Sequence, residues 1–185
     1  TRRPRESFCR GAGAHEPHAH AHRSFADVEA LIDGSSFSAW TRARARAIFR
    51  RIAEAEGRIH AQPISDVTFH EVGAIDSIVD ILLGCRALEL LRVEQILSSV
   101  PSLGQGFVEC QHGEYPVPSA ATLEILKGLP VRQEDDPFEL VTPTGAAFLA
   151  EFVTRFGPIP EMVIERIGYG IGLREHPRRP NVLRL

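Results

Sequence analysis

The sequence predicts an α/β fold, with mixed helix and sheet layers in a single domain over residues 24–185. Segments with the apolar spacing of helices alternate with short β-prone runs, an order that favours mixed layers. The length of 185 residues suits one domain, and the 43% hydrophobic content is ordinary for a globular protein. Residues 1–23 contain few large apolar side chains, so we expect a flexible, histidine-rich N-terminal segment there.

Two helices are expected first. Ser24 and Asp27 form a capping-box pattern that starts a helix over residues 25–33, and Gly34 ends it. A longer helix is expected over residues 37–60. Its apolar residues recur with the spacing of one buried face: Ile48, Ile52, Ala55 and Ile59.

A third helix is predicted over residues 76–91, after Pro63 has broken the chain. Ser77 and Asp80 match a second capping box. The helix carries an apolar stripe made of Ile75, Ile78, Val79 and Leu82. Strands are expected to follow near 93–100 and 106–110.

A fourth helix is predicted to begin at Ser119 and to end at Lys127. Gly128 follows as a left-handed cap, with Pro130 beyond it. Glu139–Val141 is expected to form a short strand.

The last predicted helix covers residues 145–156, with Thr144 as its cap and Gly157 at its end. A strand is expected near 162–167. The domain then closes with a glycine-rich turn through Gly168, Gly170 and Gly172.

Several classes of protein are disfavoured by composition. The net charge of −3 shows no general excess of positive charge of the kind that binds nucleic acid. No apolar run approaches the roughly 18 to 20 residues of a membrane helix, and the arginine-rich start lacks the apolar core of a signal peptide. The three cysteines, Cys9, Cys85 and Cys110, are widely spaced, which favours a reducing cytoplasm over a disulfide framework.

Metal-type ligands concentrate in residues 69–80, which we call the signature segment. His70, Glu71, Asp76 and Asp80 place one imidazole and three carboxylates within eleven residues, around a predicted helix start. Imidazole and carboxylate together suit a borderline divalent metal. A structural interpretation is equally open, because Asp76 could cap the helix and Asp80 could complement its positive end.

A second group of ligands lies upstream, where four histidines occur within eight residues: His15, His18, His20 and His22. Neutral imidazoles on a flexible segment can collect divalent ions such as nickel, zinc or copper. The plain alternative is a linker rich in alanine and histidine that has no defined site.

Weaker signals lie elsewhere in the chain. Thr142, Thr144 and Gly145 mark a strand-to-helix junction, whose free amides could bind a phosphate or could belong to an ordinary capped helix. Cys110 and His112 would share one face of a continuing strand, as part of a soft metal site or as a buried cysteine beside a turn. Arg42, Arg46 and Arg50 form a ladder that is typical of a solvated face and less typical of a phosphate site.

The same residues resemble the LarC family of nickel-insertion proteins. The resemblance begins in the signature segment and continues, in the family's order, over roughly residues 15–185. Its main blocks are His70–Asp80, Leu103–Cys110, His112–Gly113, Pro116–Pro118, Ala121–Glu124, Lys127–Gly128, Glu139–Ala147, Ile167–Gly170 and Pro180–Arg184.

The resemblance implies insertion of nickel into pyridinium-3,5-bisthiocarboxylic acid mononucleotide, a CTP-dependent cyclometallation in the synthesis of the nickel-pincer cofactor. It implies nickel ligands among His15, His18, His20, His22, His70, Asp76 and Asp80, and a proton acceptor at Glu71 or Asp76. Thr142, Thr144 and Gly145 would meet the phosphate of the mononucleotide. Magnesium-CTP is expected for the full-length family protein, and a homo-oligomer is expected.

Two departures from the family pattern bear on activity. Thr68 stands where the family usually has a second histidine, two residues before His70. The family's opening segment and its C-terminal nucleotide-binding domain are also missing from this sequence. We therefore expect the chain to supply the metal- and substrate-binding portion. The alternative is a non-catalytic nickel-binding module or a metallochaperone that needs a partner chain.

Overall fold

The computed structural model describes residues 23–69, 73–110, 113–172 and 180–185. Strand β1 (Arg23–Ser24) leads into helix α1 (Phe25–Asp33), which the Ser24 capping box starts as predicted. The Asp27 amide donates to Ser24 Oγ at 3.2 Å, and the Ser24 amide donates to Asp27 Oδ2 at 2.9 Å. Gly34 ends the helix, although in a right-handed conformation.

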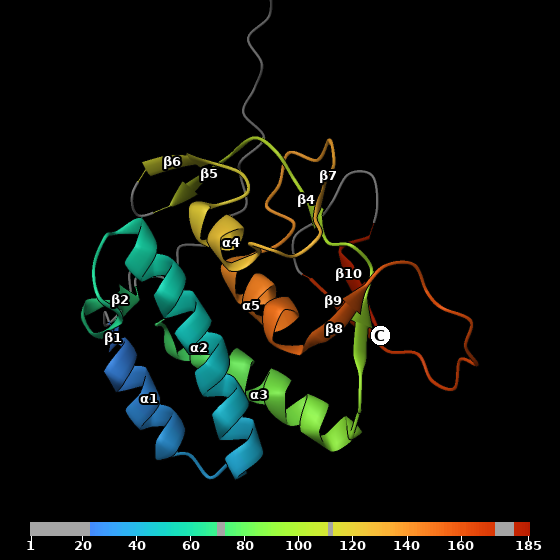
Figure 1. Cartoon of the computed structure of the whole chain (residues 1–185), viewed down its shortest axis with the longest axis horizontal. Coiled ribbons are helices and arrows are strands. Elements are labelled where there is room, and N and C mark those ends of the chain that lie inside the picture. The colour runs from blue at the N-terminus through green and yellow to red at the C-terminus, as the bar shows by residue number, and fades with distance from the viewer. Residues whose placement is uncertain (1–22, 70–72, 111–112, 173–179) are drawn as a thin grey trace, which may run out of the picture.

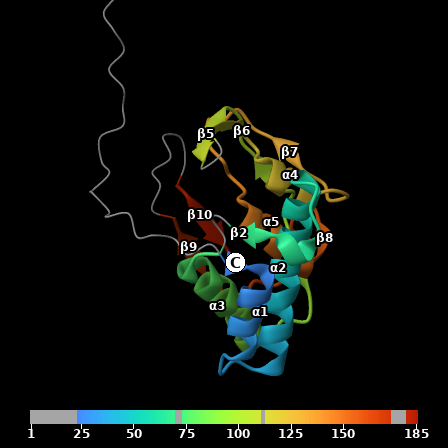
Figure 2. The same cartoon turned by 90° about the vertical axis from the view of Figure 1, so that its left-hand side faces the viewer.

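Helix α2 (Ala39–Ile59) lies at the centre of the helical layer (Figures 1 and 2). It starts two residues later than predicted, because the Ser38 hydroxyl caps it by accepting the Thr41 amide at 3.1 Å. The predicted face is buried at Ile48, Ile52 and Ala55, whereas Ile59 is exposed at the helix end. The main core therefore gathers around the middle of α2, with apolar residues of α1 and α3.

Helix α3 (Ile75–Leu91) confirms the third predicted helix but not its predicted cap. The capping box of Ser77 and Asp80 is wrong, because the helix begins at Ile75 and its N-cap, Ala74, has no side-chain hydrogen bond. Ser77 consequently lies inside the first turn. The predicted apolar stripe is also divided, since Ile78 and Leu82 are buried while Ile75 and Val79 are exposed.

The strands form five two-stranded sheets in the described part of the chain. Two pairs are parallel: β3 (Ile96–Ser98) with β8 (Val153–Phe156), and β4 (Ser102–Leu103) with β7 (Arg132–Gln133). Three pairs are antiparallel: β1 with β2 (Thr68–Phe69), β5 (Phe107–Cys110) with β6 (Gly113–Pro116), and β9 (Tyr169–Ile171) with β10 (Val182–Arg184). A 3-10 turn, Ile64–Asp66, precedes β2. These pairings confirm a mixed α/β fold.

Helix α4 (Ala120–Ile125) confirms the predicted start, because the Ser119 hydroxyl caps it. The helix ends two residues before the predicted Lys127. Gly128 has a φ of +82°, the left-handed conformation that the sequence predicted. Helix α4 lies between α2 and the β5–β6 hairpin (Figure 1).

Helix α5 (Pro143–Phe152) corrects the predicted cap and the predicted end. Thr142, not Thr144, is the N-cap, and Pro143 occupies the first helical position, where a missing amide hydrogen costs nothing. The helix stops at Phe152 because Val153 turns into strand β8, which pairs with β3. The prediction of a helix to residue 156 was therefore wrong.

Two predicted strands are wrong. Glu139–Val141 is irregular, and the Val141 carbonyl accepts a hydrogen bond from the Thr122 hydroxyl at 3.3 Å rather than from a neighbouring strand. Residues 162–167 form an extended connection between β8 and β9, which projects from the molecule in Figure 1. The predicted turn at Gly168–Gly172 is largely strand β9, paired with β10.

The described helices include none that is long and apolar enough to cross a membrane.

Glu89 joins the start of α2 to the end of α3. Its carboxylate accepts hydrogen bonds from Ser38 Oγ at 2.6 Å, Thr41 Oγ1 at 2.8 Å and Arg86 Nη1 at 2.6 Å. The Ser38 bond is the largest cause that lowers the pKa of Glu89 to about 2, followed by the bonds from Arg86 and Thr41. This contact fixes the crossing of the two helices.

We predict that Glu89→Gln reduces the loss of stability in acid. Because the pKa of Glu89 is lowered in the folded state, its contribution is complete above the ordinary value of 4.5 and is lost as the pH falls towards about 2. Urea unfolding should therefore show a smaller fall in stability between pH 7 and pH 3 for the variant than for the parent. Glu161→Gln, at an exposed position, is the control. Equal falls for Glu89→Gln and the parent would contradict the assignment.

Candidate functional site

Two residues near the start of the signature segment, Phe69 and Gly73, are anchored in the core. Phe69, its first residue, is buried and packs against the rings of Phe25 and Phe49. Gly73 is buried too, and its carbonyl accepts a hydrogen bond from Arg23 Nη1 at 2.7 Å.

Gly73 is required by close packing rather than by an unusual backbone angle. A Cβ added there would lie 2.8 Å from Phe69 Cβ and 2.9 Å from the Phe69 carbonyl oxygen. The absence of a side chain at Gly73 therefore lets the start of α3 approach Phe69.

Asp76 and Asp80 lie in the first two turns of α3, and both are exposed. Their spacing of four residues places them on one side of the helix, where such side chains are neighbours. Asp76 Oδ1 accepts a hydrogen bond from the Ser77 amide at 2.9 Å. Asp76 also lies in the first turn of the helix, where the partial positive charge of a helix start favours a negative group. The pair is thus open to a cation from solvent.

The other predicted ligands lie outside the described residues. They are His15, His18, His20, His22, His70 and Glu71. In the described part of the chain, no group of three or more histidine, cysteine or acidic side chains is placed to hold a metal ion. Asp76 and Asp80 are therefore the predicted metal residues whose positions the structure gives, and a complete ligand set would need residues beyond them.

Cys110 ends strand β5 and pairs with Gly113 at the start of β6. His112 lies outside the described residues. The face that Cys110 and His112 were expected to share therefore stays a prediction.

The start of α5 leaves few amides for a phosphate. Pro143 has no N–H, the Gly145 amide donates to Thr142 Oγ1 at 3.3 Å, and the Ala146 amide donates to the Thr142 carbonyl at 2.8 Å. An anion could meet the Thr144 amide and could displace the Thr142 hydroxyl from Gly145. The predicted phosphate site at Thr142, Thr144 and Gly145 thus depends on opening the cap.

Glu139 was missed as a site residue by the sequence analysis, which placed it in a strand. Its Oε1 atom is buried and has no hydrogen-bond partner among the described residues. An unsatisfied buried carboxylate oxygen is costly, and such groups often have a functional reason. Its sequence neighbours gave no charge or spacing signal that distinguished it.

The predicted arginine ladder mainly binds α1 to α2. Arg46 pairs with Asp33 and, at 3.7 Å, with Glu29, and Arg50 approaches Glu29 at 3.8 Å. The solvated-face interpretation is therefore refined, because two of the three arginines hold a neighbouring helix.

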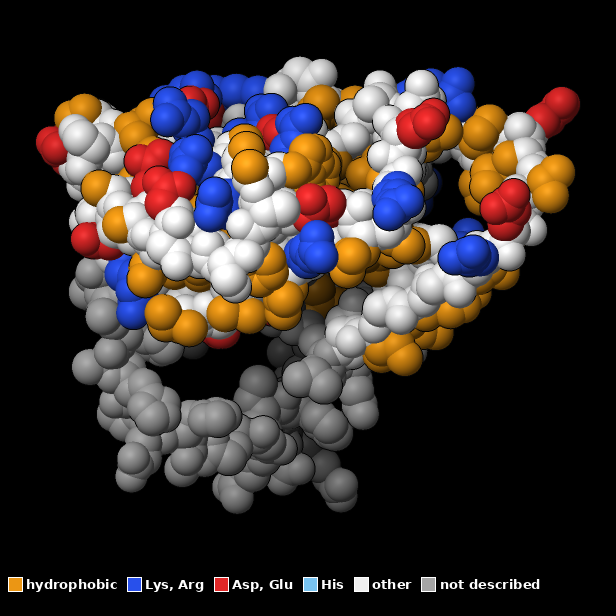
Figure 3. Space-filling model, turned by 90° about the horizontal axis from the view of Figure 1, so that it is seen from below, with side chains coloured by type: hydrophobic (Ala, Val, Ile, Leu, Met, Phe, Trp, Pro, Cys, Tyr) orange, Lys and Arg blue, Asp and Glu red, His pale blue; other side chains and the backbone are white. Residues whose placement is uncertain are grey.

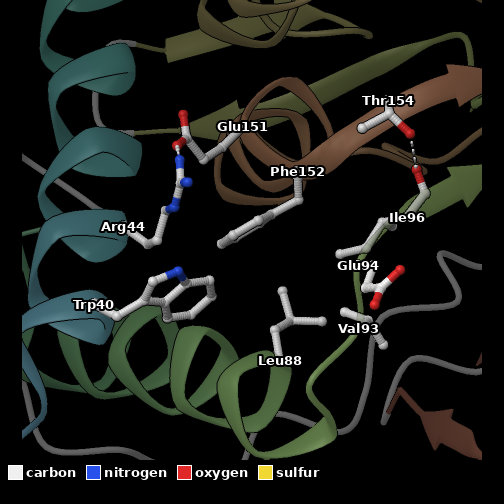
Figure 4. A pocket seen from close by; sticks show the side chains of 9 residues that line it. All are labelled: Trp40, Arg44, Leu88, Val93, Glu94, Ile96, Glu151, Phe152 and Thr154. Carbon is white, nitrogen blue, oxygen red and sulfur yellow. Dashed lines mark hydrogen bonds and ion pairs between the residues drawn. The ribbon is translucent and has the colours of Figure 1, made fainter.

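A pocket of about 300 Å³ lies where α2, α3 and α5 meet strands β3 and β8 (Figure 4). Trp40 and Phe152 line it with stacked rings whose centroids are 6.1 Å apart. At its edge, Glu151 pairs with Arg44 at 2.7 Å and with Arg51 at 3.0 Å. Figure 4 shows Glu94 across the pocket from Trp40. The lining combines apolar and aromatic side chains with the charged groups of Arg44, Glu94 and Glu151, and the Thr154 hydroxyl donates to the Ile96 carbonyl at 3.1 Å.

Cys85 lies close to this ion pair, in the core face of α3. Its thiol is fully buried, and burial, followed by the nearby Glu151 charge, raises its pKa to about 12. Cys85 is therefore a protonated core residue at neutral pH.

Comparison with known families identifies the chain. A family described as nickel insertion protein matches residues 5–185. The chain belongs to this nickel-insertion family. The match confirms the resemblance seen in the signature segment and covers every described element.

Curated relatives carry a more specific name. This chain is 49% identical over 173 residues to the pyridinium-3,5-bisthiocarboxylic acid mononucleotide nickel insertion protein of Geobacillus kaustophilus, a match that covers 94% of this chain and 42% of the relative. It is 48% identical over 163 residues to the protein of the same name from Acetivibrio thermocellus, covering 87% of this chain and 40% of the relative. The chain thus spans less than half the length of these relatives. No solved structure matches it.

We predict that Gly73→Ala destabilises the protein by about 1 to 3 kcal/mol, because the added methyl group must push against the Phe69 backbone and Cβ. Gly145→Ala is the matched control, since its added Cβ would meet Thr142 Oγ1 at 3.6 Å, an ordinary contact. Urea unfolding measures both variants. Similar stabilities for the two would show that the Gly73 backbone can move away from Phe69 at little cost.

Proposed function

We propose that the chain takes part in inserting nickel into pyridinium-3,5-bisthiocarboxylic acid mononucleotide and supplies metal- and substrate-binding residues. The names of the relatives support the substrate. The observation that carries the proposal is the pair of exposed carboxylates, Asp76 and Asp80, in the signature segment, where Phe69 and Gly73 are anchored in the core. Nickel, the metal substrate, suits this mixture of carboxylate and imidazole ligands.

The histidines are proposed to act in two places. His15, His18, His20 and His22 would collect nickel ions, because imidazoles closely spaced in sequence can share a borderline metal. His70 would then take the ion together with Asp76 and Asp80. A collector of this kind concentrates the metal, and the carboxylates hold it beside the substrate.

Proton transfer is assigned to the carboxylates. Forming a nickel–carbon bond to the pyridinium ring releases the ring proton, which needs an acceptor within hydrogen-bond reach. Glu71 and Asp76 are the proposed acceptors, because both belong to the signature segment and carry carboxylates. Thr142, Thr144 and Gly145 are proposed to bind the substrate phosphate at the start of α5, as helix starts do. We further propose dependence on magnesium-CTP, a cytoplasmic location and assembly as a homo-oligomer.

The second candidate is a nickel-binding module or metallochaperone without catalysis of its own. It is favoured by the fact that the chain spans less than half the length of its relatives. Incubating the chain with substrate, nickel and magnesium-CTP, and following product by mass spectrometry, separates the two. Multiple turnover by this chain alone would exclude the module, whereas nickel binding without turnover would support it.

We predict that replacing His15, His18, His20 and His22 with alanine lowers the number of nickel ions bound by the chain. Isothermal titration calorimetry measures the stoichiometry and affinity. The unfolding midpoint should stay the same, because the replacement removes no large apolar side chain. Unchanged stoichiometry and affinity would remove this segment from the proposal.

We predict that Asp76→Asn weakens the remaining nickel binding at least about tenfold, which corresponds to about 1.4 kcal/mol. Asparagine keeps an oxygen that can accept the Ser77 amide, so the fold should be retained while the charge is lost. The titration is done in the four-alanine background, so that the upstream histidines do not mask the site.

Asp66→Asn is the control for this variant. Asp66 is also exposed and also bonds a neighbouring serine, Ser65 Oγ, at 2.9 Å. Its variant should bind nickel as the background does. Normal affinity in Asp76→Asn would contradict a charge-dependent role, and a matched loss of stability and affinity would favour a structural role.

A further inference from the structure

Helix α3 is apolar on two sides. Ile78, Ile81, Leu82 and Cys85 face the core and are buried. A second stripe, which we call the outer face of α3, consists of Ile75, Val79, Leu83 and Leu90, all exposed. Helical spacing places these four side chains on one side of the helix. A helix that is hydrophobic around most of its circumference belongs in the interior of a protein, so the outer face needs a cover.

The β9–β10 hairpin also needs a cover. Tyr169, Ile171, Leu183 and Leu185 are exposed, with Ile171 at 79%. A two-stranded hairpin is marginally stable on its own in water. The connection that precedes it is equally apolar and exposed at Ile159, Met162, Val163, Ile164 and Ile167. Figure 3 shows hydrophobic side chains gathered along the lower part of the face seen from below and around this connection at the right.

The pocket at Trp40 lies at the other end of α3. Leu88 lines it, and the exposed residues Leu90, Leu91 and Val93 lie next to it in the chain. An apolar side chain of a covering segment could fill this pocket, as anchor residues do at protein interfaces. Uncovered apolar surface of this extent is unusual for a complete monomeric protein.

The N-terminal segment of this chain has too little apolar surface to be the cover. Among residues 1–22, Phe8 is the one large hydrophobic side chain. The relatives offer a better source, because the matched region is 42% of the Geobacillus kaustophilus protein and 40% of the Acetivibrio thermocellus protein. More than half of each relative thus lies outside the part that corresponds to this chain.

We propose that the outer face of α3 and the β9–β10 hairpin form the docking surface for the remaining part of the family's polypeptide. The occupant is a largely apolar surface of that part, because aliphatic side chains dominate the outer face, as in a domain core or an obligate interface. Helical spacing places Arg86 among them, and its guanidinium donates to Glu89 at 2.6 Å. Asp76 and Asp80 border the outer face on the same helix. The docked part would therefore lie beside the two carboxylates and complete the walls around them.

Cysteine labelling tests this surface. Val79→Cys probes the outer face, and Leu31→Cys on α1 is the control, since the two parent side chains are 43% and 44% exposed. The labelling rate of each variant is measured in this chain alone and in a joined protein. In the joined protein, the chain replaces the matched region of the Geobacillus kaustophilus relative. Labelling by a maleimide is read for each peptide by mass spectrometry, and unreactive Cys85 reports an intact core.

Val79→Cys should react at least tenfold more slowly in the joined protein than in the chain alone, while Leu31→Cys reacts equally in both. Equal rates for Val79→Cys would overturn the proposal. Slow labelling in the chain alone, with a dimer in sedimentation analysis, would also overturn it, because a second copy would then be the occupant. The measurement needs no nickel, so its outcome is independent of the proposed function.

A second arrangement guards against misfolding of the joined protein. If Cys85 reacts there, the chain and the remainder of the relative are produced together as two polypeptides, and the labelling is repeated on the two polypeptides purified together as a complex. Unprotected Val79→Cys in that preparation would overturn the proposal as well.

Discussion

Each helix that surrounds α2 is tied to it by an acidic side chain. Asp33 of α1 pairs with Arg46, Glu89 of α3 binds Ser38 and Thr41, Glu124 of α4 pairs with Arg58, and Glu151 of α5 pairs with Arg44 and Arg51. Because the arginines of these pairs reach solvent, which screens the attraction, the pairs add limited stability even where the Glu124 and Glu151 carboxylates are shielded. They orient the neighbours, while the burial of Ile48, Phe49 and Ile52 supplies the driving force. The positions of the signature segment and of the start of α5 both follow from this arrangement.

Much of the helical part could be predicted because its signals are local. The Ser24 box, the Ser119 cap and left-handed Gly128 each depend on a few adjacent residues. The predictions failed where a distant partner decides the structure. Strand β8 ends α5 early because β3 lies beside it, and residues 162–167 stay outside any sheet. Neither outcome can be deduced from the local sequence.

The candidate site was less accessible to sequence reasoning. The spacing of Asp76 and Asp80 correctly placed both on one side of a helix, and the structure leaves them open to solvent. The packing role of Gly73 depends on Phe69 and could not be deduced from its neighbours. The Trp40 pocket joins residues more than a hundred positions apart, from Trp40 to Phe152 and Thr154, and left no pattern in the sequence. The two faces of α3 were predicted as one stripe because periodicity alone does not tell a core from an interface.

The buried thiol of Cys85 has a consequence for metal selectivity. A thiolate is a strong ligand for soft and borderline metals, and it is also the form that oxidises readily. With its pKa raised to about 12 by burial, Cys85 stays protonated, and no ion can reach it without opening the core. Under the proposed function, this thiol therefore does not compete with the sulfur-containing acceptor for nickel.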